Sequence, residues 1–123
     1  MFEIRAIITL GGVNVKLSHI VNGLQLEHVT GSLDVDVEHG YVGDLLSDVM
    51  GNAQPDSVWV TVQSHANIVA VAAITGIRAI VLAGGHDFEE ETVKKAEKEK
   101  ISLLKSPDTS FQICGKLYEL GLR

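Results

Sequence analysis

The sequence predicts an α/β domain built on a mostly parallel sheet, with a βαβαβα core, flanking helices and a β-hairpin near the N-terminus. Residues 57–63 and 78–83 are apolar runs of strand length, and the alanine- and valine-rich stretch 64–74 between them has the length of a helix. A third apolar run, 101–104, follows a charged stretch that suits a second helix. Parallel strands need such crossovers, which are almost always right-handed. A chain of 123 residues fits a single domain over 1–123.

The first third of the chain predicts short elements around a turn. The isoleucines of residues 3–10 have helical spacing, and the same residues also suit a strand. Apolar residues then alternate with polar ones on both sides of Asn22-Gly23, which predicts the β-hairpin. Apolar and acidic residues alternate over 33–37, which predicts a further strand with one acidic, solvated face.

Residues 44–50 predict a short helix before the central strand, ended by Gly51-Asn52. Its expected apolar face consists of Leu45, Leu46, Val49 and Met50. The last helix is expected after Pro107-Asp108. Its expected apolar face consists of Phe111, Cys114, Leu117 and Tyr118. This placement makes Cys114 a core side chain rather than a nucleophile.

The charged segment after Gly84-Gly85 predicts a solvated helix that runs to about Lys100. Asp87 and Glu90 have the spacing of a capping box, in which a side chain at the helix start accepts a backbone hydrogen bond. Acidic residues come first and basic residues follow, an order that the helix dipole favours. The expected i,i+4 pairs are Glu90–Lys94 and Glu91–Lys95.

Charge and composition limit the classes of function. The formal net charge is −6, and residues 1–56 carry two basic side chains against eight acidic ones. An acidic chain without a basic stripe is poorly suited to nucleic acid, so we expect no nucleic-acid partner. We also expect no membrane partner, because no apolar run reaches the roughly 20 residues of a span. The single cysteine and the lack of a signal-peptide pattern indicate the cytoplasm.

The candidate site lies where the parallel strands end, because ligands of such sheets bind beyond the carboxyl ends of the strands. Backbone N–H groups at the helix starts in these loops would suit an anion or a nucleotide phosphate. The candidate ligand-binding residues are Gln63, Ser64, His65, Asn67, Gly84, Gly85, His86, Ser106, Asp108 and Thr109.

Two other interpretations of these loops stay open. In the first, Ser64, Asp87 and Asp108 only cap helices and the two glycines only form a tight turn. In the second, His65, His86 and Asp87 bind a metal ion, since two imidazoles and a carboxylate form a known zinc set. No close spacing of these residues supports the metal, and we assign no metal ligand and no catalytic residue.

The helix expected over 64–74 is apolar on nearly all sides. A helix of that kind is normally buried on both sides. One side covers the sheet, so the other needs a cover, either the N-terminal segment or a second copy of the chain. We favour the second copy, since homodimers are the commonest assemblies.

Four segments resemble the DRTGG domain, which occurs in the N-terminal region of HPr kinase/phosphorylase, in some phosphotransacetylases, in CBS-domain pyrophosphatases and as stand-alone proteins. They are GYVGDLLSDVM (40–50), VWVTVQSHANIVAVAAITG (58–76), VLAGG (81–85) and SPDTSFQICGKLYELG (106–121). The chain departs from the residues that name the domain. Val35 stands in place of the arginine, and Glu38-His39-Gly40 stands near the expected Thr-Gly-Gly.

The resemblance implies an α/β domain that often pairs with itself and has no established catalytic activity. Kinase activity does not follow, because the chain has no P-loop, GxxxxGK[ST]. Gly115-Lys116 is followed by Leu117, and Ser110 stands in place of the upstream glycine. An iron–sulfur cluster needs about four thiolates and the chain has one, so we expect no cofactor.

The sequence is compatible with two functions from different classes. The first is a non-catalytic regulatory or interaction domain that forms a homodimer and senses a small anionic ligand such as a nucleotide. The alternative is a small metal-dependent hydrolase or phosphotransfer enzyme that uses His65, His86 and Asp87.

Overall fold

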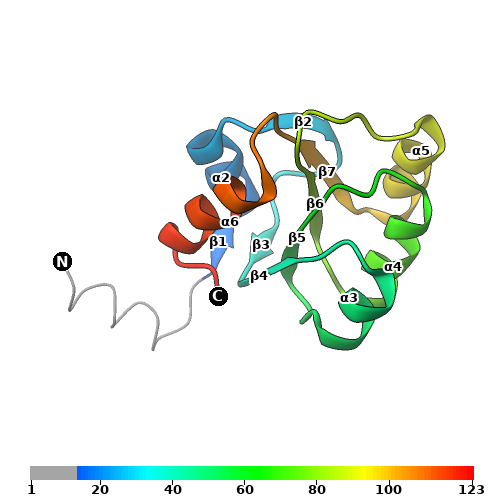
Figure 1. The fold of residues 1–123 in the computed structure, drawn as a ribbon, viewed down its shortest axis with the longest axis horizontal. Helices are drawn as coiled ribbons and strands as arrows, with labels where there is room; N and C mark the ends of the chain where they lie inside the picture. The colour runs from blue at the N-terminus through cyan, green and yellow to red at the C-terminus, as the bar shows by residue number, and fades with distance from the viewer. Residues whose placement is uncertain (1–13) are drawn as a thin grey trace.

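The computed structural model describes residues 14–123, so the element expected over 3–10 lies outside the described residues. Five strands form one sheet in the order β2-β7-β6-β5-β4 (Figure 1). They are β2 (Glu27–Thr30), β4 (His39–Val42), β5 (Ser57–Thr61), β6 (Ala79–Leu82) and β7 (Ser102–Lys105). Strands β4 to β7 run parallel and β2 is antiparallel to β7. The predicted α/β class with a mostly parallel sheet is confirmed.

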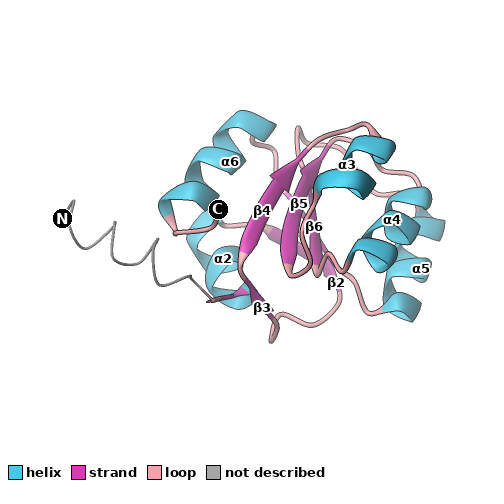
Figure 2. Cartoon of the chain, turned by 90° about the horizontal axis from the view of Figure 1, so that it is seen from below, coloured by secondary structure: helices cyan, strands magenta, loops and turns pink. Residues whose placement is uncertain are grey.

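Helices cover both faces of this sheet (Figure 2). One face carries α2 (Leu17–Leu24) and α6 (Ser110–Glu119), and the other carries α3 (Leu46–Asn52), α4 (Asn67–Thr75) and α5 (Glu90–Glu99). Alternate residues of the central strands therefore enter two separate cores. Val58, Val60 and Val81 pack towards α2 and α6, whereas Trp59, Ile80 and Leu103 pack towards the other three helices. Burial on both faces explains why these strands are continuously apolar in sequence.

Neighbouring helices cover part of the apolar surface of α4. Helices α3 and α5 pack on either side of α4 (Figure 2). Helix α4 buries Ile68, Val69, Val71 and Ala72, while Ile74 is 73% exposed. Helices α3 and α5 thus cover the flanks of α4, while Ala70, Ala73 and Ile74 on its outer side are exposed. The second copy that we expected over this outer side stays a prediction.

An antiparallel two-stranded sheet lies near the start of the described chain, but Asn22-Gly23 does not form its turn. It joins β1 (Val15–Lys16) to β3 (Asp36–Val37), which is much shorter than the expected strand over 33–37. Asn22-Gly23 lies inside α2, which contradicts the predicted position of the hairpin. Leu17, Ile20 and Leu24, all buried, have the spacing of a helical face, so the period of 3.6 prevails over the local alternation.

The apolar faces of two helices also differ from expectation. In α3 only Val49 is buried, and Leu45 and Met50 are exposed. In α6 the buried residues are Ile113 and Leu117, four positions apart, because these two side chains meet the sheet. Phe111 is 89% exposed and Tyr118 is 61% exposed, so the predicted face of α6 is wrong by part of a turn.

Helix α5 begins differently from the prediction. Its N-cap residue is Glu89, which makes no side-chain capping bond, so Asp87 and Glu90 do not form a capping box. Asp87 instead contacts Lys105, at the end of β7. The expected Glu90–Lys94 pair is present, with 3.9 Å between the charged atoms of two exposed side chains. No helix within residues 14–123 is long and apolar enough to cross a membrane.

Gly31 directly follows β2 and lies against the backbone of β7. Its φ is +94°, a value that favours glycine. A Cβ added there would lie 2.5 Å from the Cα of Ser102 in β7. The Ser102 hydroxyl donates a hydrogen bond of 2.6 Å to the carbonyl of Ser32. The β2 edge of the sheet thus depends on a residue without a side chain at position 31.

We predict that Gly31→Ala lowers the free energy of unfolding by at least about 2 kcal/mol, because the methyl group meets backbone that cannot move aside. Urea denaturation followed by circular dichroism measures the change. The matched control is Gly51→Ala in α3, where no atom lies within 4 Å of the added methyl group. This control should be neutral or stabilising by up to about 1 kcal/mol. Equal stability of the two variants would show that the approach at Gly31 is not tight.

Candidate functional site

The ten sequence-predicted site residues all follow the carboxyl ends of parallel strands. Residues 63–67 follow β5, residues 84–86 follow β6 and residues 106–109 follow β7. Because β5, β6 and β7 are parallel neighbours, the three loops lie along one edge of the sheet. We call this edge the carboxyl rim.

Backbone hydrogen bonds join two of the rim loops directly. Gly84 and Gly85 have φ values of +83° and +76°, and this pair of left-handed residues turns the chain sharply after β6. The N–H of Gly84 donates to the carbonyl of Asp108 at 2.8 Å, and the N–H of Gly85 donates to the carbonyl of Ser106 at 3.0 Å. These N–H groups bind the next loop, so they are not available to an anion as the sequence had suggested.

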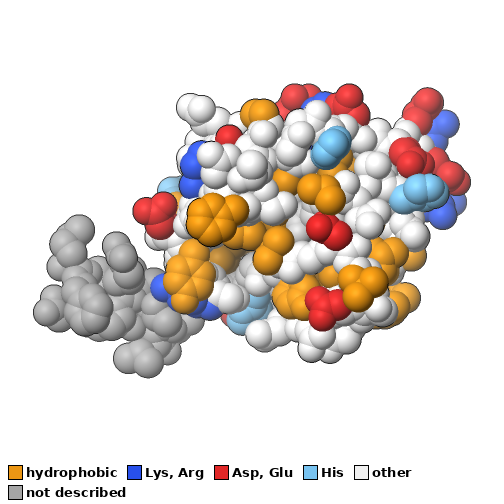
Figure 3. Space-filling view, in the orientation of Figure 1, with side chains coloured by type: hydrophobic (Ala, Val, Ile, Leu, Met, Phe, Trp, Pro, Cys, Tyr) orange, Lys and Arg blue, Asp and Glu red, His pale blue; other side chains and the backbone are white. Residues whose placement is uncertain are grey.

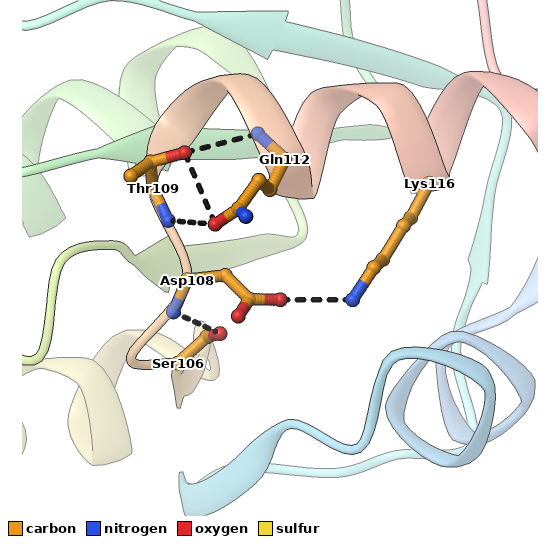
Figure 4. A network of polar contacts seen from close by, with 5 residues as sticks. All are labelled: Ser106, Asp108, Thr109, Gln112 and Lys116. Carbon is orange, nitrogen blue, oxygen red and sulfur yellow. Dashed lines mark hydrogen bonds and ion pairs between the residues drawn. The ribbon is translucent and has the colours of Figure 1, made fainter.

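The start of α6 satisfies its own backbone groups in a similar way (Figure 4). Thr109 and Gln112 form a capping box, in which each side chain bonds to the backbone N–H of the other residue. The Ser106 hydroxyl accepts a hydrogen bond of 3.0 Å from the N–H of Asp108. The ammonium group of Lys116 donates a hydrogen bond of 2.9 Å to the Asp108 carboxylate. The cap of α6 is thus Thr109 and not Asp108, and the N-cap residues of α4 and α5 are Ala66 and Glu89, so the interpretation of Ser64, Asp87 and Asp108 as helix caps is wrong.

A hollow of about 360 Å³ lies at the rim where β7 meets the antiparallel strand β2. Its lining consists of Gln25, Glu27, Gly85, His86, Lys105, Ser106 and Pro107. Three of the ten predicted residues, Gly85, His86 and Ser106, therefore share a concave surface. The other seven lie outside this lining.

Lys105 is the chemically distinctive side chain of the hollow. Its side chain is 25% exposed and contacts the carboxylate of Asp87, with Glu27 at 3.7 Å. The hydrogen bond to Asp87 raises the pKa of Lys105, and the same bond lowers the pKa of Asp87. Lys105 is thus a firmly protonated ammonium group between two carboxylates, and both carboxylates are mostly in water.

The loop after β5 faces the other end of the rim. The Gln63 amide donates a 3.0 Å hydrogen bond to the carbonyl of Asp44. The carbonyl of Ser64 accepts hydrogen bonds from the hydroxyl of Thr92 and from the N–H of Glu89, which fix the start of α5. The imidazole of His65 lies 3.7 Å from Glu89 and is exposed. Gln63, Ser64 and His65 therefore join neighbouring elements of the fold.

The histidines do not assemble into a metal centre. Within residues 14–123, no group of three or more His, Cys, Asp or Glu side chains has an arrangement that could hold a metal ion. Asp87 is bound to Lys105, while His65 pairs with Glu89. His65 and Asp87 thus contact different partners, in two different loops.

Asp44, the first residue of the segment predicted as a short helix over 44–50, is a structural residue of the rim. Its carboxylate accepts hydrogen bonds from the hydroxyl of Thr61 at 2.8 Å and from the N–H of Val62 at 2.9 Å. Thr61 is fully buried. Together with the bond from the Trp59 indole to the carbonyl of Gly43, at 2.8 Å, these contacts join the loop after β4 to the end of β5.

Four residues that line the hollow were not among the residues predicted from the sequence. Gln25 and Glu27 enter it because β2 pairs with β7, and no local pattern indicates this pairing. Lys105 could have been predicted, because it is a single basic residue directly after the apolar run 101–104, where the strand ends at the carboxyl rim. Pro107 was assigned only to the turn before the last helix.

We predict that Asp44→Ala lowers the free energy of unfolding by about 2 kcal/mol, because it leaves a buried hydroxyl and a backbone N–H without their acceptor. Thermal and urea unfolding measure the change. Asp48→Ala is the matched control, since Asp48 accepts from the exposed groups of Tyr41 and Asn52. Its removal should cost less than about 1 kcal/mol. Equal losses for both variants would contradict the special role of Asp44.

The chain was compared with protein-family models, curated proteins and solved structures, and only solved structures match it. No protein-family model matches the chain, and no curated protein matches it. Among solved structures, it is similar to the CBS and DRTGG domains of the regulatory region of a Clostridium perfringens pyrophosphatase, a structure complexed with the activator diadenosine tetraphosphate. The TM-score is 0.69 at 17% sequence identity, over 83% of this chain and 45% of that chain. At this identity the similarity shows a shared fold.

Proposed function

We propose that the chain is a non-catalytic regulatory domain of the DRTGG kind, which acts in the cytoplasm, pairs with itself and binds a small anionic ligand such as a nucleotide. The observation that carries the ligand proposal is the hollow at the carboxyl rim. It holds one partly buried ammonium group, Lys105, whose present partners are two mostly exposed carboxylates. An anion that enters the hollow can replace those carboxylates.

The DRTGG assignment is supported by where the family-like segments fall. Residues 40–50 run from β4 into α3, and residues 58–76 form β5 and α4. Residues 81–85 end β6 and turn the chain at the rim, and residues 106–121 span the rim loop and α6. The neighbouring solved structure contains a domain of this name, in a regulatory region and in complex with a nucleotide activator.

The size of the hollow limits the ligand. Small-molecule sites typically measure about 300–1,000 Å³. At about 360 Å³, this hollow fits a group of the size of one nucleoside phosphate. A longer dinucleotide would extend beyond the lining into solvent.

The charges at the hollow make the exchange of partners feasible. The side chain of Asp87 is 80% exposed, so its contact with Lys105 is a surface ion pair. Such pairs contribute about 0–1 kcal/mol, and Asp87 can return to water at little cost. A phosphate offers several charged oxygens to the same ammonium group, and charge-assisted hydrogen bonds to phosphate are among the stronger ones. Ligand and Asp87 therefore compete for Lys105.

We predict opposite effects for the two members of this pair. Asp87→Asn removes the competing carboxylate and should raise the affinity for AMP or ATP several-fold. Lys105→Met removes the ammonium group and should lower it by about 10-fold or more, the magnitude of a hydrogen bond to a charged group. Isothermal titration calorimetry with AMP, ATP, diadenosine tetraphosphate and inorganic phosphate measures both effects. No turnover of these compounds is expected.

Lys94→Met is the matched control, because Lys94 pairs with Glu90 on the exposed face of α5, away from the lining of the hollow. It should leave the affinity unchanged. A decrease in the affinity for these anions in Asp87→Asn would contradict the competition between Asp87 and the ligand for Lys105. Equal binding by the wild type and Lys105→Met would rule out the hollow as the anion site.

A further inference from the structure

Helix α6 presents a stripe with two aromatic side chains that residues 14–123 leave uncovered. Phe111, Cys114 and Tyr118 lie at positions i, i+3 and i+7, which is one face of a helix. Phe111 and Tyr118 are mostly exposed and Cys114 is half-buried. Figure 3 shows hydrophobic side chains gathered on the face that carries α6 and the neighbouring edge of the sheet. Exposed apolar patches of this kind commonly mark interaction sites.

An apolar groove lies beside this stripe. It has a volume of about 200 Å³ and runs between α6 and the edge strand β4. Its lining includes Val42, Val60, Cys114, Tyr118 and Arg123. The guanidinium group of Arg123 lies 3.9 Å from the ring centre of Tyr118 and holds that ring at the rim of the groove. An apolar cavity of about 150 Å³ can bind benzene, so this groove can receive one phenyl ring.

We infer that a second copy of this chain covers the face, with the two α6 helices packed antiparallel and Phe111 of each copy inserted beside Tyr118 of the other. This surface is the one that we assign to the self-pairing of the proposed function, and the inference rests on that proposed function. The projecting ring and the groove lie on the same face of one molecule. A two-fold axis places each opposite its counterpart, as an isologous interface requires.

The sequence of α6 fits this arrangement. Phe111 and Tyr118 are equally far from a crossing point between Cys114 and Gly115, so an antiparallel pair places each Phe111 beside the other Tyr118. At the crossing point Gly115 has no side chain, and no described atom lies within 4 Å of where its Cβ would be, so the helices can approach closely. The stripe carries no charge, and the nearby Lys116 is bound to Asp108.

Contact between the two α6 helices alone buries too little surface for a stable dimer. A standard interface buries about 800 Å² on each partner. Helix α6, with ten residues, is only about 15 Å long. The contact therefore has to include the β4 edge, where Val42 is 50% exposed and lies opposite the groove residue Val60.

Sedimentation velocity of the purified chain over a wide range of concentrations tests the surface. The wild type should be a dimer, and Phe111→Asp should raise the dissociation constant at least about 100-fold, as expected for a central aromatic anchor. The monomer should stay folded, because Phe111 is exposed and an acidic side chain suits the start of a helix. Circular dichroism and the thermal midpoint verify this.

Ile74→Asp is the matched control, since Ile74 is also a mostly exposed apolar residue and lies on α4, across the sheet from α6. It should leave the dimer intact. If the wild type and Phe111→Asp are equally dimeric, the α6 surface is wrong while self-pairing stands. A monomer at every concentration overturns both. Calorimetry with AMP on the same Phe111→Asp protein reports on the ligand proposal separately, because the hollow does not include Phe111.

Discussion

The burial of β5 and β6 on both faces is the constraint on which the rest of the structure depends. Every residue of these two strands is buried. Their side chains enter two cores on opposite sides, so helices must cover both faces of a small sheet. One layer of helices covers each face of the sheet. Polar and functional groups of the strands therefore lie at the strand ends and at the sheet edges.

At the carboxyl rim this constraint has a further consequence. The loops after β6 and β7 are short, and they satisfy their backbone groups by bonding to one another, through Gly84 and Gly85 to Asp108 and Ser106. The capping box bonds the N–H groups of Thr109 and Gln112 at the next helix start. An anion that reaches this rim therefore does not find the N–H groups of Gly84, Gly85 or Thr109 free. For this reason the recognition that we propose depends on Lys105 and on the ease with which Asp87 leaves it.

The comparison of sequence and structure shows which patterns carry information about the fold. The parallel units from residue 57 onwards were predictable, because strands buried on both faces are continuously apolar and the helices between them have suitable length. The short elements before them were not. Alternation beside Asn22-Gly23 suggested a hairpin, while the buried Leu17, Ile20 and Leu24 show that the helical period decides the structure.

The candidate site was predictable only as an edge. Parallel strands place Gly85, His86 and Ser106 together, and the hollow indeed contains all three. Its remaining wall comes from β2, whose antiparallel pairing with β7 spans almost eighty positions of the sequence. Similarly, the face of α6 depends on how Ile113 and Leu117 meet the sheet, which a helical wheel alone does not determine. Long-range pairing and helix rotation are tertiary properties, so single-sequence patterns miss them.

The two proposed binding surfaces lie at the ends of one continuous segment. Ser106 and Pro107 line the hollow, and α6, which carries Phe111, begins directly after the capping residue Thr109. The contact between Asp108 and Lys116 joins the rim loop to the second turn of the helix. A ligand that alters the rim loop would thus act on the orientation of α6. By linkage, any effect of the ligand on dimer affinity must equal the effect of dimerisation on ligand affinity. A regulatory domain with this geometry would need no hinge between domains to transmit binding, because one helix takes part in both surfaces.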